Sequence, residues 1–236
     1  MYPVIRPLLT FLLGLTCVSA LFAQGEPNLA AKPEPRPDQI YWHQTFSAQA
    51  KKGGIDLLFL GDSITQCWTY EGKELWARRY APLKAANFGI GSDRTEHVLW
   101  RVQNGTLDGV QPKVLVLLIG TNNIKRDTAP QIAEGVGAII GEIRARLPKT
   151  KILLLALFPR AETPDDWRRR KVAEVNTHLA RFDDGRNVFF LDLGPRFLRA
   201  DDTLSKGVMH DFLHLTSEGY QIWADAMDEK LSRLLK

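Results

Sequence analysis

Cysteine is scarce in this sequence. The 236 residues include only Cys17 and Cys67, and Cys17 lies in an N-terminal apolar run of the kind that is removed from exported proteins. A disulfide-rich framework is therefore excluded, and the mature chain must be stabilised by its hydrophobic core. No Cys/His signature surrounds Cys67, so we interpret it as a buried apolar residue rather than a catalytic thiol.

Strong net charge and long basic tracts are also absent. The formal net charge is +4 at pH 7, which is too small to indicate a nucleic-acid partner. The basic run at residues 168–171 closely follows Asp165 and Asp166, and this mixture favours a solvated helix face over a phosphate-binding patch. We therefore expect no nucleic acid among the partners of this protein.

One apolar run is long, and it lies at the N-terminus. Residues 8–22 are almost wholly apolar and follow Arg6, but the run is shorter than the about 20 residues that span a membrane. With small residues at Ala20 and Ala23, it predicts a signal peptide over residues 1–23, cleaved after one of these two alanines. We expect a secreted or periplasmic protein without stable membrane insertion after processing; a retained N-terminal anchor is the alternative.

Proline is concentrated just after this run. Residues 24–38 contain Pro27, Pro33, Pro35 and Pro37 among polar residues, which fixes φ repeatedly and supplies nothing to bury. We interpret residues 24–38 as a Pro-rich linker. The folded domain is then expected to cover residues 39–236 and to begin with a helix at 40–52.

Five short apolar runs follow, separated by segments long enough for a helix: residues 55–60, 85–88, 114–119, 152–158 and 188–193. The runs are apolar on both faces, as parallel strands covered by helices on each side must be. Thr128 and Gln131 form a capping-box pattern, and Thr163 with Pro164 carries the signals of another helix start. The sequence therefore predicts a three-layer α/β/α sandwich with a central five-stranded parallel sheet. In such sheets, ligands bind beyond the carboxyl ends of the strands.

Polar residues that suit catalysis follow three of these runs. Ser63 comes directly after the first one, although the ordinary role of a serine at a helix start is that of an N-cap. Residues 87–93 follow the second run and Asn122 follows the third, where turn geometry is the ordinary role. Because these loops share one edge of a parallel sheet, we expect a serine hydroxyl and an asparagine amide to meet there.

Asp211 and His214 stand three residues apart before the final helix. In one helical turn they would lie on the same side, so that the carboxylate could accept from Nδ1–H and leave Nε2 free as a base. A metal site built on His210, Asp211 and His214 is the alternative. No second acidic or histidine cluster lies near in sequence, so we expect no metal.

In this order, the motifs resemble those of the GDSL/SGNH hydrolases. The matching motifs are Gly61-Asp62-Ser63, the Gly-x-Asn of Gly120 to Asn122, and the Asp-x-x-His of Asp211 to His214. Residues 87–93, 96–105 and 211–216 look most like the catalytic subunits of platelet-activating-factor acetylhydrolase and their bacterial relatives. The resemblance implies a flavodoxin-like SGNH hydrolase fold. The α/β-hydrolase elbow is not matched, because Thr65 stands where its second glycine belongs.

The resemblance also implies a catalytic triad. It makes Ser63 the nucleophile, His214 the general base and Asp211 the group that orients the imidazole. This chemistry requires neither a metal nor an organic cofactor.

An oxyanion hole is implied at the same site. Its donors would be the backbone N–H groups of Ser63 and Ser92 and the side-chain amide of Asn122, with Asp62 and Gly91 as supporting neighbours. The family has glycine where this chain has Ser92, and a serine keeps the backbone N–H that the role needs.

We therefore predict a secreted serine esterase that hydrolyses short-chain acyl esters, chiefly acetyl esters, with a small molecule or glycan as substrate. Acetylated carbohydrate is the first expectation. A short-chain lipid or phospholipid ester, an inactive carbohydrate-binding module on the same fold, and an acyltransferase are the alternatives. The sequence leaves the oligomeric state open and is compatible with a homodimer.

Overall fold

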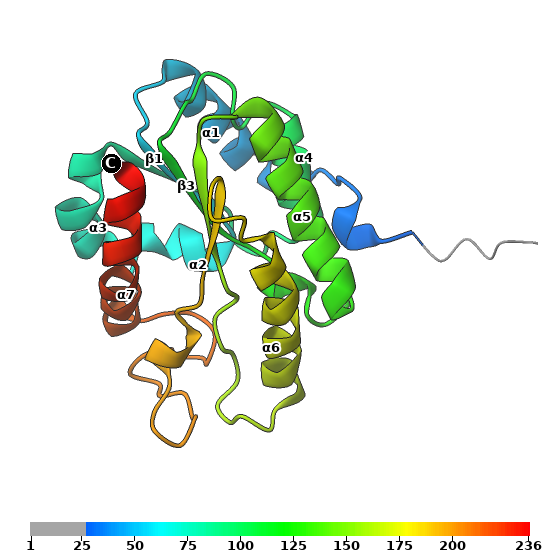
Figure 1. Cartoon of the computed structure of the whole chain (residues 1–236), viewed down its shortest axis with the longest axis vertical. Helices are drawn as coiled ribbons and strands as arrows, with labels where there is room; N and C mark the ends of the chain where they lie inside the picture. The colour runs from blue at the N-terminus through cyan, green and yellow to red at the C-terminus, as the bar shows by residue number, and fades with distance from the viewer. Residues whose placement is uncertain (1–26) are drawn as a thin grey trace, which may run out of the picture.

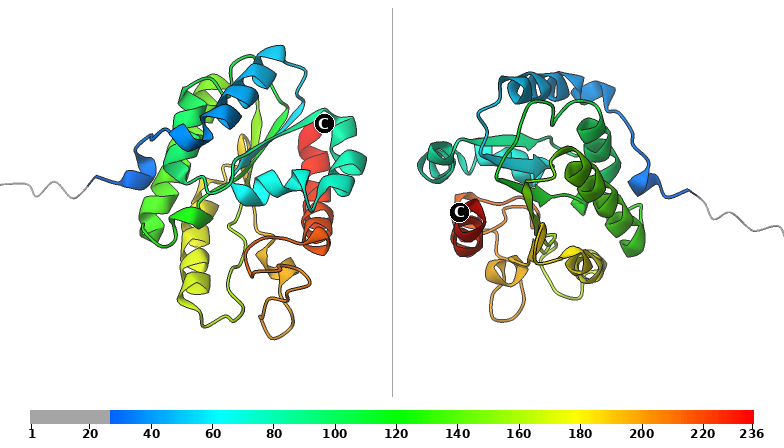
Figure 2. Two further views of the ribbon diagram at one scale, coloured as in Figure 1. Left: turned by 180° about the vertical axis from the view of Figure 1, so that it is seen from behind. Right: turned by 45° about the horizontal axis from the view of Figure 1, so that its top comes forward.

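The computed structural model describes residues 27–236, so the predicted signal peptide lies outside the described residues (Figures 1 and 2). Its centre is a five-stranded, all-parallel sheet in the order β2-β1-β3-β4-β5. The strands are β1 (Leu57–Gly61), β2 (Ala85–Gly89), β3 (Val114–Leu118), β4 (Lys151–Leu155) and β5 (Val188–Leu191). The predicted fold class and all five strand positions are confirmed.

Helices cover both faces of the sheet, which explains why the central strands are wholly apolar (Figure 2). On one face lie α1 (Ile40–Lys52), α4 (Thr95–Gln103), α5 (Ala129–Arg146) and α6 (Trp167–Leu179). On the other lie α3 (Lys73–Arg79) and α7 (Ser217–Leu235), while the short α2 (Ser63–Gln66) follows β1.

Short 3-10 helices fill several connections: η1 (Leu29–Ala31), η2 (Pro37–Gln39), η3 (Cys67–Thr69), η4 (Ala81–Leu83), η5 (Thr121–Asn123), η6 (Ala180–Phe182) and η7 (Gly194–Phe197). Among residues 27–236, no helix combines the length and the apolar character needed to cross a bilayer.

The strand register brings together the loops that carry Ser63, Ser92 and Asn122. Gly61, the last residue of β1, pairs with Gly89 at the end of β2 and with Leu118 at the end of β3. The loops that follow these three strands therefore begin side by side at one edge of the sheet, as the parallel topology predicts.

The start of α5 is confirmed and the predicted start of α6 is wrong. Thr128 and Gln131 form the predicted capping box at α5. In contrast, α6 begins at Trp167, because Asp166 and not Thr163 caps it by accepting from the backbone N–H of Arg168. Thr163 and its following proline belong to the loop before the helix.

Residues 28–38 are attached to the domain instead of forming a linker, and we call them the N-terminal strap. Ala30 is completely buried, and its carbonyl accepts from Thr95 Oγ1 of α4 at 2.7 Å. Asn28 Nδ2 donates to Gln131 O and to a Glu134 carboxylate oxygen of α5, at 3.0 and 2.9 Å. The prolines are exposed, as predicted, but the residues between them supply the contacts, so the folded domain begins near residue 28.

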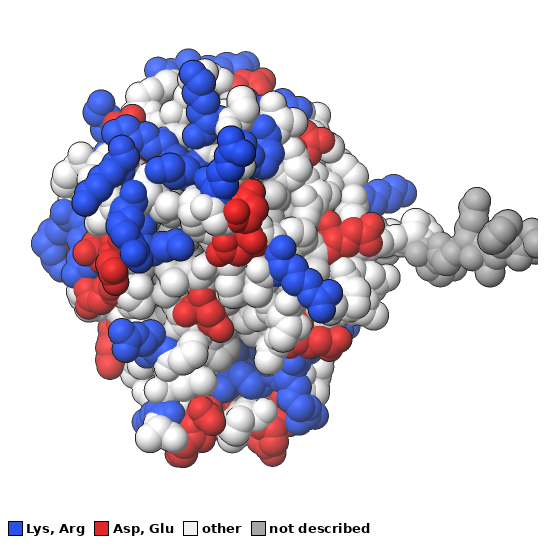
Figure 3. All heavy atoms as spheres, viewed as in Figure 1, with Lys and Arg blue, Asp and Glu red and all other residues white. Residues whose placement is uncertain are grey.

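Charged side chains of both signs cover the surface. In the view of Figure 3, Lys and Arg gather over the upper part of the molecule, and acidic side chains are interspersed among them. Around the loops at the bottom of this view, the two signs are mixed.

Candidate active site

Ser63 is the first residue of α2, and only Asp62 separates it from the buried strand β1. The N-cap is Asp62, whose Oδ1 accepts from the backbone N–H of Ile64 at 2.9 Å. The capping role that a serine at this position ordinarily has is thus taken by its neighbour, and the Ser63 hydroxyl is available for another partner.

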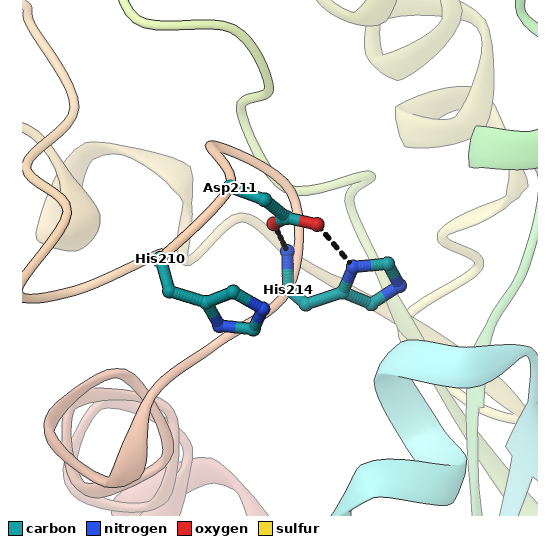
Figure 4. Close-up of side chains that lie close together, drawn as sticks. All are labelled: His210, Asp211 and His214. Carbon is teal, nitrogen blue, oxygen red and sulfur yellow. Dashed lines mark hydrogen bonds and ion pairs between the residues drawn. The ribbon is translucent and has the colours of Figure 1, made fainter.

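That partner is His214. Ser63 Oγ lies 3.0 Å from His214 Nε2. On the other side of the ring, His214 Nδ1 lies 2.7 Å from Asp211 Oδ2 (Figure 4). When Nδ1 carries a proton and donates it to the carboxylate, Nε2 is left to accept from the serine hydroxyl. The three side chains form one continuous hydrogen-bonded chain that can move a proton away from Ser63 Oγ.

A turn, and not the predicted helical turn, holds Asp211 and His214 together. Asp211 Oδ1 accepts from the backbone N–H groups of Leu213 and His214, at 3.0 and 2.7 Å, and Phe212 adopts a left-handed φ of 59°. Burial would raise the pKa of Asp211, but the hydrogen bonds from the backbone and ring of His214 outweigh it and lower this pKa. The carboxylate is therefore ionised at neutral pH.

Buried aromatic side chains connect the segment that carries Ser63 to the segment that carries His214. Tyr220 of α7 is buried, and its hydroxyl donates to the backbone oxygen of Ile64 in α2 at 2.7 Å. Its ring packs against Trp68 and Trp223 with centroid distances of 4.5 and 5.9 Å. These contacts join the helix that begins with Ser63 to the helix that follows His214, so the hydroxyl and imidazole are held by the core.

The loop after β2 forms the next part of the candidate site. A Cβ at Gly91 would lie 3.9 Å from Ser63 Cβ, so this loop passes beside the serine. The N–H of Gly91 is occupied, because it donates to Gln66 Oε1 at 2.9 Å. The N–H of Ser92 has no acceptor within residues 27–236, and Ser92 holds a left-handed φ of 63°. The Ser92 N–H is thus a free backbone donor in this loop, and its role in an oxyanion hole stays a prediction.

Asn122 is held in place by the same loop. Its Nδ2 donates to the backbone oxygen of Asp93 at 2.8 Å, which uses one of the two amide protons and leaves the second for another acceptor. Gly120, just before it, has a φ of 127° that an L-side chain rarely adopts. In the Gly-x-Asn pattern, Gly120 thus supplies a backbone conformation that favours glycine, and Asn122 supplies a side-chain amide whose orientation is fixed by a hydrogen bond.

Asp62, which precedes Ser63, has a buried carboxyl group, with 1% of the residue exposed. Its Oδ2 has no hydrogen-bond partner among the described residues. Burial raises the pKa of Asp62 to about 7, and the nearby charge of Asp93 acts in the same direction. This carboxyl group therefore titrates near neutral pH.

The site could also be read as a catalytic thiol at Cys67 or as a metal site on His210, Asp211 and His214. Burial raises the pKa of the half-buried Cys67 to about 11, so its thiol stays protonated at neutral pH and is a poor nucleophile. His210, Asp211 and His214 do bring potential metal-ligand atoms within 4.8 Å of one another. However, both ring nitrogens of His214 already have partners in Ser63 and Asp211, whereas His210 makes no contact marked in Figure 4.

Sequence reasoning missed a cluster of charged residues behind the loop after β2. Asp93 is buried between Arg36, 3.1 Å from Oδ1, and Arg101, whose Nε and Nη2 each lie 2.9 Å from Oδ2. Arg101 also donates to the backbone oxygens of Gly61 and Phe88 at the ends of β1 and β2, at 3.3 and 3.1 Å. Asp93 belongs to the motif at residues 87–93, but no sequence pattern around Arg36 or Arg101 indicates that these arginines contact it.

Comparisons with known proteins match the chain to a family model and to named relatives. Residues 59–222 match the model of the GDSL-like Lipase/Acylhydrolase family. Human platelet-activating factor acetylhydrolase IB subunit alpha2 is 39% identical over 221 residues, which covers 91% of this chain and 95% of that protein. The human alpha1 subunit is 36% identical over 217 residues, covering 89% and 93%.

Solved structures share the fold. An acetylxylan esterase from Geobacillus stearothermophilus superposes with a TM-score of 0.62 at 20% identity, covering 78% of this chain and 94% of that one. A GDSL-like lipase from Bacteroides thetaiotaomicron gives a TM-score of 0.63 at 18% identity, covering 81% and 97%.

Proposed function

The chain belongs to the GDSL-like lipase/acylhydrolase family and is an ester hydrolase, and we propose that it hydrolyses short-chain acyl esters, chiefly acetyl esters, with Ser63 as the nucleophile. The observation that carries this proposal is the hydrogen-bonded chain from Asp211 through His214 to Ser63. The names of the relatives, which include acetylhydrolase subunits, support the preference for acetyl groups.

The proposed reaction proceeds in two halves. Ser63 Oγ attacks the ester carbonyl carbon while its proton moves to His214 Nε2, and the ionised Asp211 stabilises the resulting imidazolium. The imidazolium then gives that proton to the departing alcohol, which leaves an acyl group on Ser63. In the second half, His214 takes a proton from water as the water oxygen attacks the acyl carbon. The bond between the acyl carbon and Ser63 Oγ then breaks, the imidazolium returns its proton to Ser63 Oγ, and the acid departs.

The negative charge that develops on the carbonyl oxygen needs donors. In this proposal they are the backbone N–H groups of Ser63 and Ser92 and the second amide proton of Asn122. The free N–H of Ser92 and the fixed orientation of Asn122 support this assignment.

We propose acetylated carbohydrate as the substrate class. A cavity of about 410 Å³ adjoins Asp211. Most of its lining side chains are charged or carry a hydroxyl group, and the rest are apolar: Arg160, Glu162, Thr163, Asp166 and Arg168, with Ala161, Phe212 and Leu213. Such a lining suits a ligand that offers many hydroxyl groups and is unfavourable for an acyl chain, because buried polar groups lose free energy without hydrogen-bond partners. The signal peptide predicted over residues 1–23 supports action outside the cytoplasm.

An acetylated phospholipid is the second candidate, since the relatives that are 39% and 36% identical are named for platelet-activating factor. Acetylated xylo-oligosaccharides and an acetylated glycerophospholipid, assayed side by side, distinguish the two. A kcat/KM that favours the phospholipid at least tenfold would overturn the carbohydrate assignment while leaving the esterase mechanism in place.

The role of Ser63 is tested by Ser63→Ala, with Ser232→Ala as the matched control because Ser232 is an exposed residue of α7. We expect Ser63→Ala to lose roughly 10⁴-fold or more in kcat on p-nitrophenyl acetate with an unchanged melting temperature. The control should retain both properties. Turnover by pure Ser63→Ala protein within tenfold of wild type would refute the nucleophile assignment.

A further inference from the structure

The N-terminal strap does more than cover α4 and α5, because one of its side chains reaches the loop beside the nucleophile. Arg36 Nη1 donates to the backbone oxygen of Gly91 at 2.7 Å and to Asp93 Oδ1 at 3.1 Å. Only 16% of the Arg36 side chain is exposed, and its other terminal nitrogen donates to Asp38 Oδ2 within the strap at 2.7 Å. One terminal nitrogen of the guanidinium group is thus bound within the strap, and the other is bound to Gly91 and Asp93 in the loop.

The acceptor at Gly91 matters because of peptide geometry. The carbonyl of Gly91 and the N–H of Ser92 belong to one peptide group, which is planar and trans. In a trans peptide the C=O and the N–H point in opposite directions, so a donor that fixes the oxygen also fixes where the N–H points. The carbonyl of Gly91 bonds to Arg36, and the N–H of Ser92 is the free donor of this loop. A hydrogen bond to the carbonyl also polarises the peptide group and strengthens the N–H as a donor.

The loop needs such a restraint. Ser92 is a non-glycine residue with a φ of 63°, a backbone conformation that persists only where the surrounding structure enforces it. Asp93 anchors the next position through Arg101, but Arg101 makes no hydrogen bond to Gly91. Of the contacts within residues 27–236, the one that holds the Gly91 carbonyl comes from Arg36.

We propose that Arg36 is a positioning residue for catalysis: through the Gly91 carbonyl, it orients the Ser92 N–H toward the ester oxygen, which makes the N-terminal strap part of the active site. This inference rests on the proposed function, because it assigns to the Ser92 N–H the role of an oxyanion donor. An orienting contact of this kind acts on the transition state, where the charge develops, more than on substrate binding.

The first test is Arg36→Ala in the full chain, assayed on p-nitrophenyl acetate with Arg36→Lys and Lys32→Ala for comparison. Lys32 is an exposed strap residue outside the loop contacts. We expect Arg36→Ala to lower kcat at least tenfold with KM within twofold of wild type. Arg36→Lys should restore part of kcat, because an ammonium group can reach one of the two acceptors but lacks the planar fork. Lys32→Ala should match wild type.

A second test moves the strap without altering Arg36. A Cβ at Gly135 of α5 would collide with the backbone oxygen of Ala30 and with Thr95 Oγ1, whereas a Cβ at Gly141 of the same helix meets no atom within 4 Å. We therefore expect Gly135→Ala to reduce kcat and Gly141→Ala to leave it unchanged. This pair keeps the inference testable if Arg36→Ala fails to fold.

The outcomes separate the two proposals. Full activity in Ser63→Ala would refute the proposed function itself. If Ser63→Ala is inactive while folded Arg36→Ala keeps kcat within twofold of wild type, the positioning role is wrong. A lower melting temperature with normal kcat would overturn it as well, because Arg36 would then act on stability alone. Equal kcat in Gly135→Ala and Gly141→Ala would also count against it.

Discussion

The buried carboxyl group of Asp62 makes the stability of this protein depend on pH in a direction opposite to that of most aspartates. Burial raises its pKa in the folded state to about 7, so the folded protein holds this proton more tightly than the unfolded chain does. The free energy of unfolding of the wild type should therefore fall as the pH rises from about 4 through about 7. Above about pH 8, the contribution of the protonated Asp62 carboxyl group to the free energy of unfolding is completely lost.

Asp62→Asn removes the titration and keeps the cap. An asparagine Oδ1 can accept from the Ile64 N–H as Asp62 does now, and its amide nitrogen replaces the Oδ2 that has no partner among the described residues. The difference between an ordinary aspartate pKa, about 4, and the folded-state value corresponds to about 4 kcal/mol. About 3 kcal/mol of it should develop between about pH 4.5 and pH 8.

Urea denaturation of wild type and Asp62→Asn across this pH range measures the effect. The variant should gain in free energy of unfolding relative to wild type as the pH rises. Asp56→Asn is the control, because the Asp56 side chain is 45% exposed and loses little solvation on folding. A difference between Asp62→Asn and wild type that stays constant from pH 4.5 to 8 would show that Asp62 is not buried as a protonated carboxyl group.

Two further substitutions examine the proposed oxyanion hole. Asn122→Ala should lower kcat on a short-chain ester by roughly 10² to 10³, about 3 to 4 kcal/mol, with KM little changed; a near-normal kcat together with a lower melting temperature would identify Asn122 as a turn residue only. Ser92→Gly should raise the free energy of unfolding by about 1 kcal/mol, because glycine adopts the φ of 63° without steric cost. It should keep kcat within about threefold, since the backbone N–H remains; a loss of stability in urea denaturation would contradict this account of the backbone.

The sequence predicted the sheet and the loops that carry the candidate site residues because both depend on patterns that are local in the chain. A fully buried parallel strand needs an uninterrupted apolar run, and each of the five runs became a strand. The parallel topology then placed Ser63 and Asn122 at one edge, whatever the detailed packing. Asp211 and His214 were predicted to share a helical turn and instead share a hydrogen-bonded bend, in which Phe212 is left-handed. Spacing fixes which residues are near each other, but it does not fix the backbone that joins them.

The start of α6 shows how tertiary contacts override local signals. Thr163 and Pro164 carry a cap and a favourable first residue, yet the helix begins after Asp166. Arg169, one turn into α6, is buried and donates to the backbone oxygens of Arg160 and Ala161 at 3.1 and 2.6 Å. These bonds require the preceding loop to fold back over the helix. The run at residues 168–171 is therefore not wholly the solvated face that its charge pattern predicts.

The N-terminal strap could not be predicted because its contacts leave no periodic pattern. It is held by single groups, such as the carbonyl of Ala30 and the guanidinium of Arg36, and exposed prolines lie between them. The burial of Asp93, which the strap contacts through Arg36, could not be predicted from the sequence either. A buried carboxylate is tolerated only when cations neutralise it, and the two arginines that do so, Arg36 and Arg101, lie far apart in the chain. Removing either arginine would leave the buried Asp93 carboxylate with one arginine in place of two, directly behind the loop that passes Ser63. We therefore propose that the motif residues carry the chemistry of this site and that charged residues outside the motifs hold its loops in place.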